Sequence, residues 1–265
     1  MAVRREMSKE QRDAATRIIE GSGNNFHCKV AKFFADADWR VQISPYYVDP
    51  STDKTREIDL IAERLYPTTD TWGRIDGYIR LRLHVECKYI AQGTVFWFGD
   101  QDVAAARSWV ARRTPFKEDN VYINEHHYLK GVKHVAKLFA TERSGGNVEN
   151  EPIFKALNQT LNALLNSRGF ISERKHVKCK ATVEYPVIVC SAFDQFARTP
   201  INGDGSVSRI DDNFLLEVNY AYLTRETARP FSEYFLIDVV EYHRLPEFLS
   251  LLENEVSGFV EMLKD

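Results

Sequence analysis

The chain has few cysteines, and their spacing indicates neither a metal site nor a disulfide framework. Among its 265 residues there are four, Cys28, Cys87, Cys179 and Cys190, and no two of them form a C-x-x-C pair. This spacing argues against the zinc-binding motifs that are built on paired cysteines. We therefore expect buried, reduced thiols in a cytoplasmic protein.

Long apolar runs are also missing. No stretch approaches the length of a membrane-spanning helix, and residues 1–5 are not followed by the apolar core of a signal peptide, so we expect neither. The sequence contains no internal repeat and no G-x-x-x-x-G-K-[ST] loop. The absence of that loop argues against a nucleotide-driven motor such as a helicase.

A large excess of one charge is absent as well, because the formal net charge is only −3. This value argues against a surface coated with lysine for general polyanion binding, but it leaves a local basic cleft open. Residues 107–137 hold seven Lys and Arg against three acids, whereas residues 233–265 hold eight acids against two Lys and Arg. A nucleic-acid footprint is therefore expected in the middle of the chain.

The sequence does contain two segments with the alternation of half-buried strands. Arg56 to Ala62 carries Glu57 and Asp59 at alternate positions, and Leu81 to Tyr89 carries His84, Glu86 and Lys88 at alternate positions. Since alternate side chains of a strand share a face, two acids and a lysine could meet on adjacent strands. Apolar residues flank both segments, and a helical pattern precedes the first.

Carboxylates and a lysine in this arrangement suit metal-assisted hydrolysis of a phosphodiester. A hard cation such as Mg2+ takes carboxylate oxygens, water and phosphate oxygens as ligands. Lysine adds a donor toward the attacking water or the phosphoryl oxygens. An ordinary solvated strand face explains the same residues, because 28% of the chain is charged.

At these residues the chain resembles the PD-(D/E)XK nuclease superfamily, with Asp59 as the motif's Asp and Glu86-Cys87-Lys88 as its E-X-K. The resemblance implies a restriction-endonuclease-like core and a nuclease that depends on Mg2+, with Mn2+ as a substitute. It also implies that Asp59 and Glu86 bind the metal and that Lys88 is the catalytic lysine. DNA is the expected substrate, cut endonucleolytically in a restriction or defence role.

The sequence departs from the superfamily pattern at two points. Ile58 stands where the superfamily name has Pro, and the predicted helix at 24–37 lacks the Glu that many members carry there. Glu20, just upstream, is our candidate for the auxiliary acid; Glu57 or no residue at all are the alternatives. A predicted helix Gln, Gln159, lies off its apolar stripe and is expected to face solvent.

For the fold we expect an α/β or α+β protein with a mixed central sheet flanked by helices. Residues 144–147 are the best linker candidate. They separate a nuclease core at 1–143 from strands and helices at 148–265 that extend it, although one domain over 1–265 fits equally well. A capping box of Ser8 and Gln11 predicts a helix at 8–20, and apolar periodicity predicts helices at 152–169 and 246–263, the last with its acids outward.

Three histidines, His126, His127 and His134, suggest a metal site only weakly. No acid or cysteine nearby completes a ligand set, so we expect surface histidines.

Two alternatives to the enzyme stay open: a nuclease-like module that binds nucleic acid or protein without cutting, and a structural subunit that docks through its acidic C-terminal helix. A homodimer would let one site per subunit cut both strands.

Overall fold

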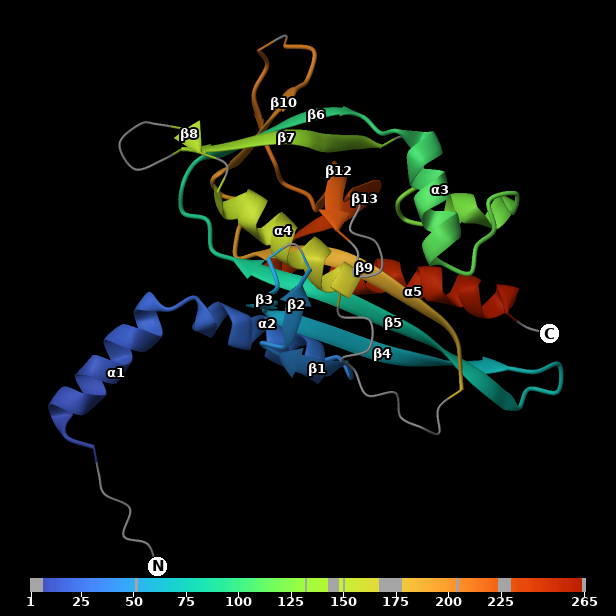
Figure 1. The fold of residues 1–265 in the computed structure, drawn as a ribbon, viewed down its shortest axis with the longest axis horizontal. Coiled ribbons are helices and arrows are strands. Elements are labelled where there is room, and N and C mark those ends of the chain that lie inside the picture. The colour runs from blue at the N-terminus through green and yellow to red at the C-terminus, as the bar shows by residue number, and fades with distance from the viewer. Residues whose placement is uncertain are drawn as a thin grey trace, which may run out of the picture.

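The computed structural model describes residues 7–50, 52–131, 133–142, 148–149, 151–166, 178–203, 205–223 and 230–263. Within these ranges the protein is a mixed α/β structure with a large mixed sheet and flanking helices, as predicted (Figure 1). The linker candidate at 144–147 lies outside the described residues. So does Gly169, near the predicted end of one helix.

The main sheet has eleven strands in the described ranges. Their order across the sheet is β1 (Arg40–Ile43), β4 (Leu60–Thr69), β5 (Ile75–Lys88), β9 (Cys179–Cys190), β13 (Pro230–Glu241), β12 (Phe214–Leu223), β7 (His134–Glu142), β6 (Thr94–Asp100), β10 (Phe196–Pro200) and β11 (Ser208–Arg209), with β8 (Val148–Glu149) paired to β7. Strand β5 pairs antiparallel with β4 and parallel with β9. Strand β5, which carries the E-X-K residues, therefore lies inside the sheet, with a strand from the second half of the chain beside it.

Helices cover both faces of this part of the sheet. The helices in the described ranges are α1 (Lys9–Gly21), α2 (Asn24–Asp36), α3 (Val103–Arg113), α4 (Glu151–Asn166) and α5 (Leu245–Met262), with short 3-10 turns at Val121–Glu125 and Tyr242–Arg244; of these, α1 stands apart from the sheet. Ala163 of α4 clusters with Ile61, whose neighbour across the strands is His84. Tyr185, on the opposite face, reaches Glu255 of α5. The face that carries Glu86 is thus the α4 face.

A bend places the motif's aspartate. Strands β2 (Tyr46–Asp49) and β3 (Lys54–Glu57) form a separate antiparallel ribbon that continues the β1–β4 pair. At the junction, Ser44 donates its N–H to the Asp59 carbonyl at 2.8 Å, and Ser44 has a φ of 53°. A positive φ is uncommon for a residue other than glycine and marks a sharp change of direction. Asp59 therefore lies at a corner between β3 and β4, and the predicted continuous strand from Arg56 to Ala62 is interrupted there.

Two further expectations can be compared with the structure. All four cysteines are free thiols; Cys87 and Cys190 are buried as predicted, Cys179 is only half-buried, and the prediction is wrong for Cys28, which is exposed. Within the described residues, no helix combines the length and hydropathy needed to cross a membrane.

Candidate active site

The structure brings Asp59 and Glu86 together through hydrogen bonds between neighbouring strands. The Cys87 N–H donates to Asp59 Oδ2 at 2.8 Å, and the Asp59 N–H donates to Glu86 Oε1 at 3.3 Å. Each carboxylate therefore takes a backbone donor from the other's segment. This reciprocal pair holds the two acids side by side where β4 begins and β5 ends.

Lys88 joins the same face, as the alternation along β5 predicts. Its Nζ lies 2.8 Å from Glu86 Oε2, and its side chain keeps 19% exposure while that of Glu86 has none. Although burial acts to lower the pKa of Lys88, the adjacent carboxylate of Glu86 raises it. The ammonium therefore stays charged at the edge where the site meets solvent.

The surroundings of Glu86 disfavour its negative charge. Its pKa is raised to about 8, chiefly by burial and also by the charge of Asp59, against the opposing effect of Lys88. Asp59 Oδ1 receives no hydrogen bond from the part of the chain that the structure describes. Two adjacent carboxylates with spare acceptor capacity and too little positive charge are the donor set that a hard divalent cation fits.

A histidine from α2 completes the immediate surroundings of Asp59. His27 Nε2 lies 3.2 Å from Asp59 Oδ2, and the His27 side chain is 20% exposed. It lies one helical turn before the buried residues Val30, Ala31 and Phe34. Sequence reasoning missed His27, although its place on the i, i+3, i+4, i+7 stripe of the helix was a signal for a polar residue turned inward.

The other acids considered from the sequence are not joined to this cluster. Glu20 is exposed near the end of α1, and no hydrogen bond or ion pair connects it to the described site residues. Glu57 ends β3, in the separate ribbon, away from the face it was expected to share with Asp59. His84, on the Glu86 face, is fully buried and lies 3.3 Å from Glu184.

Gln159 approaches the site from α4 rather than facing solvent as predicted. Its Nε2 donates to the Glu57 carbonyl at 3.2 Å, and its backbone carbonyl accepts the hydroxyl of Tyr47 at 3.4 Å. The Gln159 Oε1 is buried and lacks a hydrogen-bond partner. Burial raises the pKa of Tyr47, and the charge of Glu86 adds to this effect. The contacts of Gln159 with Glu57 and Tyr47 place α4 beside the site.

The basic residues expected to form a nucleic-acid footprint are mostly paired within the protein. Arg113 and Lys137 lie 2.8 and 2.7 Å from glutamates, and Lys130 lies 3.0 Å from Glu125. Arg107 donates to Asn124 and to a backbone carbonyl. These contacts occupy the positive charge of the 107–137 segment with internal acceptors.

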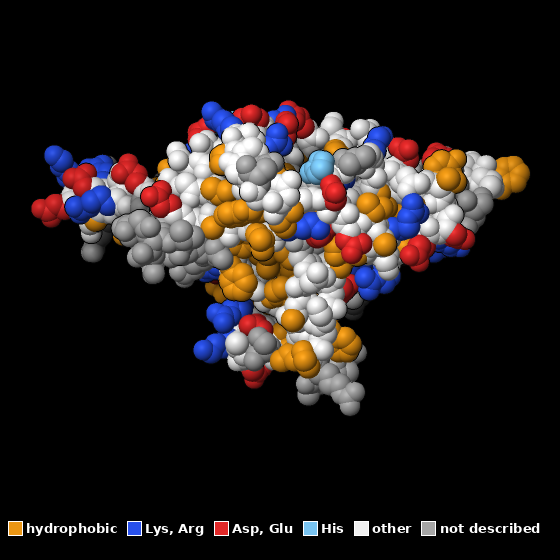
Figure 2. Space-filling model, turned by 90° about the horizontal axis from the view of Figure 1, so that it is seen from above, with side chains coloured by type: hydrophobic (Ala, Val, Ile, Leu, Met, Phe, Trp, Pro, Cys, Tyr) orange, Lys and Arg blue, Asp and Glu red, His pale blue; other side chains and the backbone are white. Residues whose placement is uncertain are grey.

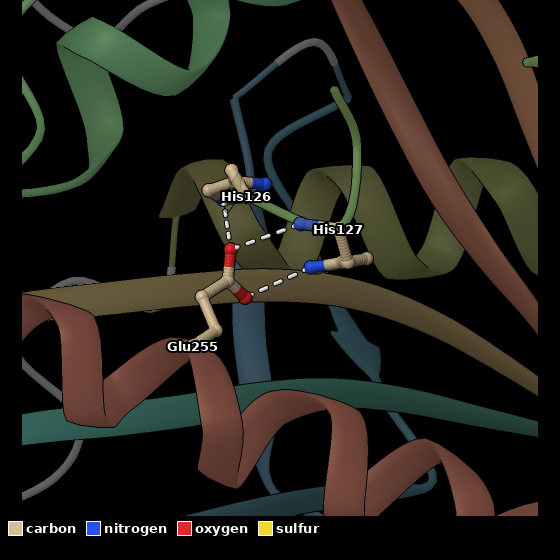
Figure 3. Close-up of side chains that lie close together, drawn as sticks. All are labelled: His126, His127 and Glu255. Carbon is tan, nitrogen blue, oxygen red and sulfur yellow. Dashed lines mark hydrogen bonds and ion pairs between the residues drawn. The ribbon is translucent and has the colours of Figure 1, made fainter. Parts of the chain in front are cut away.

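A second cluster of buried titratable residues lies on the opposite face of the sheet (Figure 3). His126 Nε2 is 2.9 Å from Glu255 Oε1, and His127 Nδ1 is 2.8 Å from Glu255 Oε2. Both histidines are buried, so the expectation of surface histidines is wrong for them; His134 is exposed. Glu255 lies on the buried stripe of α5 with Leu252, Val256 and Phe259, so it is also an exception to the expectation of outward acids.

The contacts of Glu255 favour a hydrogen-bond network over a metal site. Glu255 takes four donors, because Tyr185 and the His127 N–H add to the two imidazoles. His126 Nδ1 accepts the Tyr128 N–H at 3.1 Å, which assigns the ring proton to Nε2, the atom that faces Glu255. The carboxylate has no free lone pair, and the His126 nitrogen that faces it is protonated. Although burial acts to raise it, the two histidines hold the pKa of Glu255 well below its ordinary value.

Comparison of the chain with protein-family models gives no match, and comparisons with curated proteins and with solved structures give no significant match. We therefore infer a function from the geometry of Asp59, Glu86 and Lys88.

Proposed function

We propose that this protein hydrolyses phosphodiester bonds of nucleic acid, with DNA as the favoured substrate and Mg2+ or Mn2+ as the required ion. The observation that carries the proposal is the meeting of Asp59, Glu86 and Lys88 at the corner of β4 and the end of β5. Asp59 and Glu86 would hold the cation. When bound, such a cation supplies charge neutralisation at the phosphorus and a more acidic water.

The residues of the chain have distinct tasks in this proposal. Lys88 donates to the Glu86 carboxylate in the absence of substrate, and its charged ammonium is the group that can turn to a phosphoryl oxygen or to the attacking water. The backbone N–H groups of Asp59 and Cys87 fix the orientation of the two carboxylates. His27 contacts Asp59 and orients it from the solvent side.

The test is cleavage of plasmid, linear duplex, single-stranded DNA and RNA with Mg2+, Mn2+ or EDTA. Lys88→Met removes the ammonium and keeps the length of the side chain, and we expect it to lower turnover about 10²–10⁴-fold. Lys32→Met is the matched control, because Lys32 is an exposed residue of α2 that pairs with Asp36. Cleavage that persists in EDTA, or that survives Lys88→Met, contradicts the proposal.

A binding module is the alternative function, and the absence of a Glu from α2 favours it. It predicts that wild type and Lys88→Met bind nucleic acid equally well in EDTA while neither cuts it with a metal present. Binding measured by fluorescence anisotropy on the same substrates separates the two functions. Metal-dependent cleavage by the wild type counts against the module.

A further inference from the structure

Helix α1 stands apart from the body of the protein (Figure 1). A capping box of Ser8 and Gln11 begins it, and Ser22 and Gly23 separate it from α2. At that corner Asn25 Nδ2 donates to the Ile19 carbonyl at 3.0 Å, and the Ser22 N–H donates to the Ile18 carbonyl at 3.0 Å. The corner thus directs α1 away from the sheet with defined geometry.

The apolar side chains of α1 are left uncovered. Ile18 is 71% exposed, Ile19 is 50% exposed, and Met7, just before the helix, is 49% exposed. Ala14, Ala15, Ile18 and Ile19 recur at spacings of three and four, so they form one stripe along the helix. A helix of 13 residues is near the length below which helices in water are marginal without packing. We therefore expect this exposed apolar stripe to pack against another surface.

The charges of α1 identify the kind of surface. Lys9, Arg12 and Arg17 are balanced by Glu10, Asp13 and Glu20. Figure 2 shows Lys and Arg side chains intermixed with Asp and Glu on the protrusion where Figure 1 has α1. A helix that follows a phosphate backbone would carry an excess of positive charge, so this neutral balance disfavours nucleic acid as the occupant.

The order of two of these charges is self-complementary. Glu10 and Arg17 are seven residues apart and lie on the same flank of the apolar stripe. When two copies of α1 lie antiparallel about a twofold axis, Glu10 faces Arg17 of the partner subunit, and the symmetry produces the pair twice. The small side chains of Ala14 and Ala15 allow close approach at the centre.

We propose that α1 is a dimerisation helix that pairs antiparallel with α1 of a second copy of this chain. The contact is small by the standard of stable interfaces, so the dimer is expected to be concentration-dependent. It is independent of the proposed nuclease activity.

Sedimentation equilibrium from low to high micromolar protein tests the proposal. Glu10→Arg and Arg17→Glu should each weaken the dimer about tenfold, because each turns two attractive pairs into repulsive ones. An equimolar mixture of the two variants should restore wild-type affinity, since every charge then faces its opposite. Lys9→Glu, a reversal on the far side of the helix, is the matched control and should leave the dimer unchanged. Ile18→Glu should abolish it.

These substitutions lie on a helix outside the packed core, so near-UV circular dichroism should match the wild type in all variants. A wild type that stays monomeric through the concentration series overturns the proposal. So does a mixture of the two charge variants that fails to dimerise, or an Ile18→Glu variant that still does.

Discussion

Two buried glutamates, one on each face of the sheet, show how similar residues acquire opposite roles. The side chains of Glu86 and Glu255 have 0% and 2% exposure, and both lie among titratable neighbours. The pKa of Glu86 is raised to about 8, chiefly by burial, whereas two histidines hold that of Glu255 well below its ordinary value against the effect of burial. Burial alone therefore does not decide whether a carboxylate is stable as an anion.

The difference comes from the donors that each carboxylate receives. Glu255 is saturated by two imidazoles, a tyrosine hydroxyl and a backbone N–H. Glu86 has Lys88 and one backbone N–H, with the negative charge of Asp59 beside it. A saturated carboxylate ties elements together, while an unsaturated pair retains affinity for a cation. This contrast is why we assign chemistry to Glu86 and a structural role to Glu255.

Neutralising each glutamate in turn tests most directly whether Glu86 and Glu255 contribute differently to stability. Glu255→Gln should lower the free energy of unfolding by about 3–5 kcal/mol, because it leaves the His127 imidazolium buried with one fewer counter-charge. Glu86→Gln should change it by less than about 1 kcal/mol, since the pKa of Glu86 is already shifted toward the neutral form. Urea unfolding at neutral pH measures both values.

Glu253→Gln is the matched control on α5, because Glu253 pairs with Arg64 at the surface, with 46% of its side chain exposed. We expect it to cost about 1 kcal/mol or less. Equal losses for Glu86→Gln and Glu255→Gln would remove the distinction between the two sites.

A second test uses pH. Burial acts to lower the pKa of His127, but the nearby Glu255 and Asp238 outweigh it and raise this pKa from 6.5 to about 9. A raised histidine pKa contributes stability that is complete below pH 6.5 and is lost as pH rises through 9, here up to about 3 kcal/mol. The depressed pKa of Glu255 contributes stability above pH 4.5 that is lost in acid. Unfolding free energies measured from pH 4 to 10 should therefore fall at both extremes.

Glu86 adds a loss of its own, because its raised pKa gives stability present below pH 4.5 and lost as pH rises through 8. Comparing wild type with Glu86→Gln separates the contributions of Glu86 and His127. The variant should keep the loss of stability between pH 6.5 and 9 that comes from His127, and it should lack the loss from Glu86 that begins at pH 4.5. A flat profile for Glu86→Gln through pH 9 would exclude His127 as a buried imidazolium.

The sequence is informative about these two sites to different degrees. Alternation along β5 is enough to predict that Glu86 and Lys88 share a face. A capping box predicts α1, and apolar stripes predict α2 and α5, all near their observed bounds. The corner at Asp59 depends on a hydrogen bond from Ser44, which lies between β1 and β2, so no pattern near Asp59 in the sequence reveals it. Glu255 and His127 are 128 residues apart, and their pairing follows from tertiary packing alone.

The smallest effect that still sharpens the comparison concerns His27. If its contact with Asp59 orients the carboxylate, His27→Ala should lower metal-dependent turnover about 10–100-fold and raise the Mn2+ concentration needed for half-maximal activity. His27→Gln, which retains a side-chain donor, should recover part of both losses. His243→Ala, an exposed histidine in the turn before α5, is the matched control and should be silent. If His27→Ala lowers turnover without changing the Mn2+ requirement, His27 acts on the substrate, and Asp59 binds the cation without help from His27.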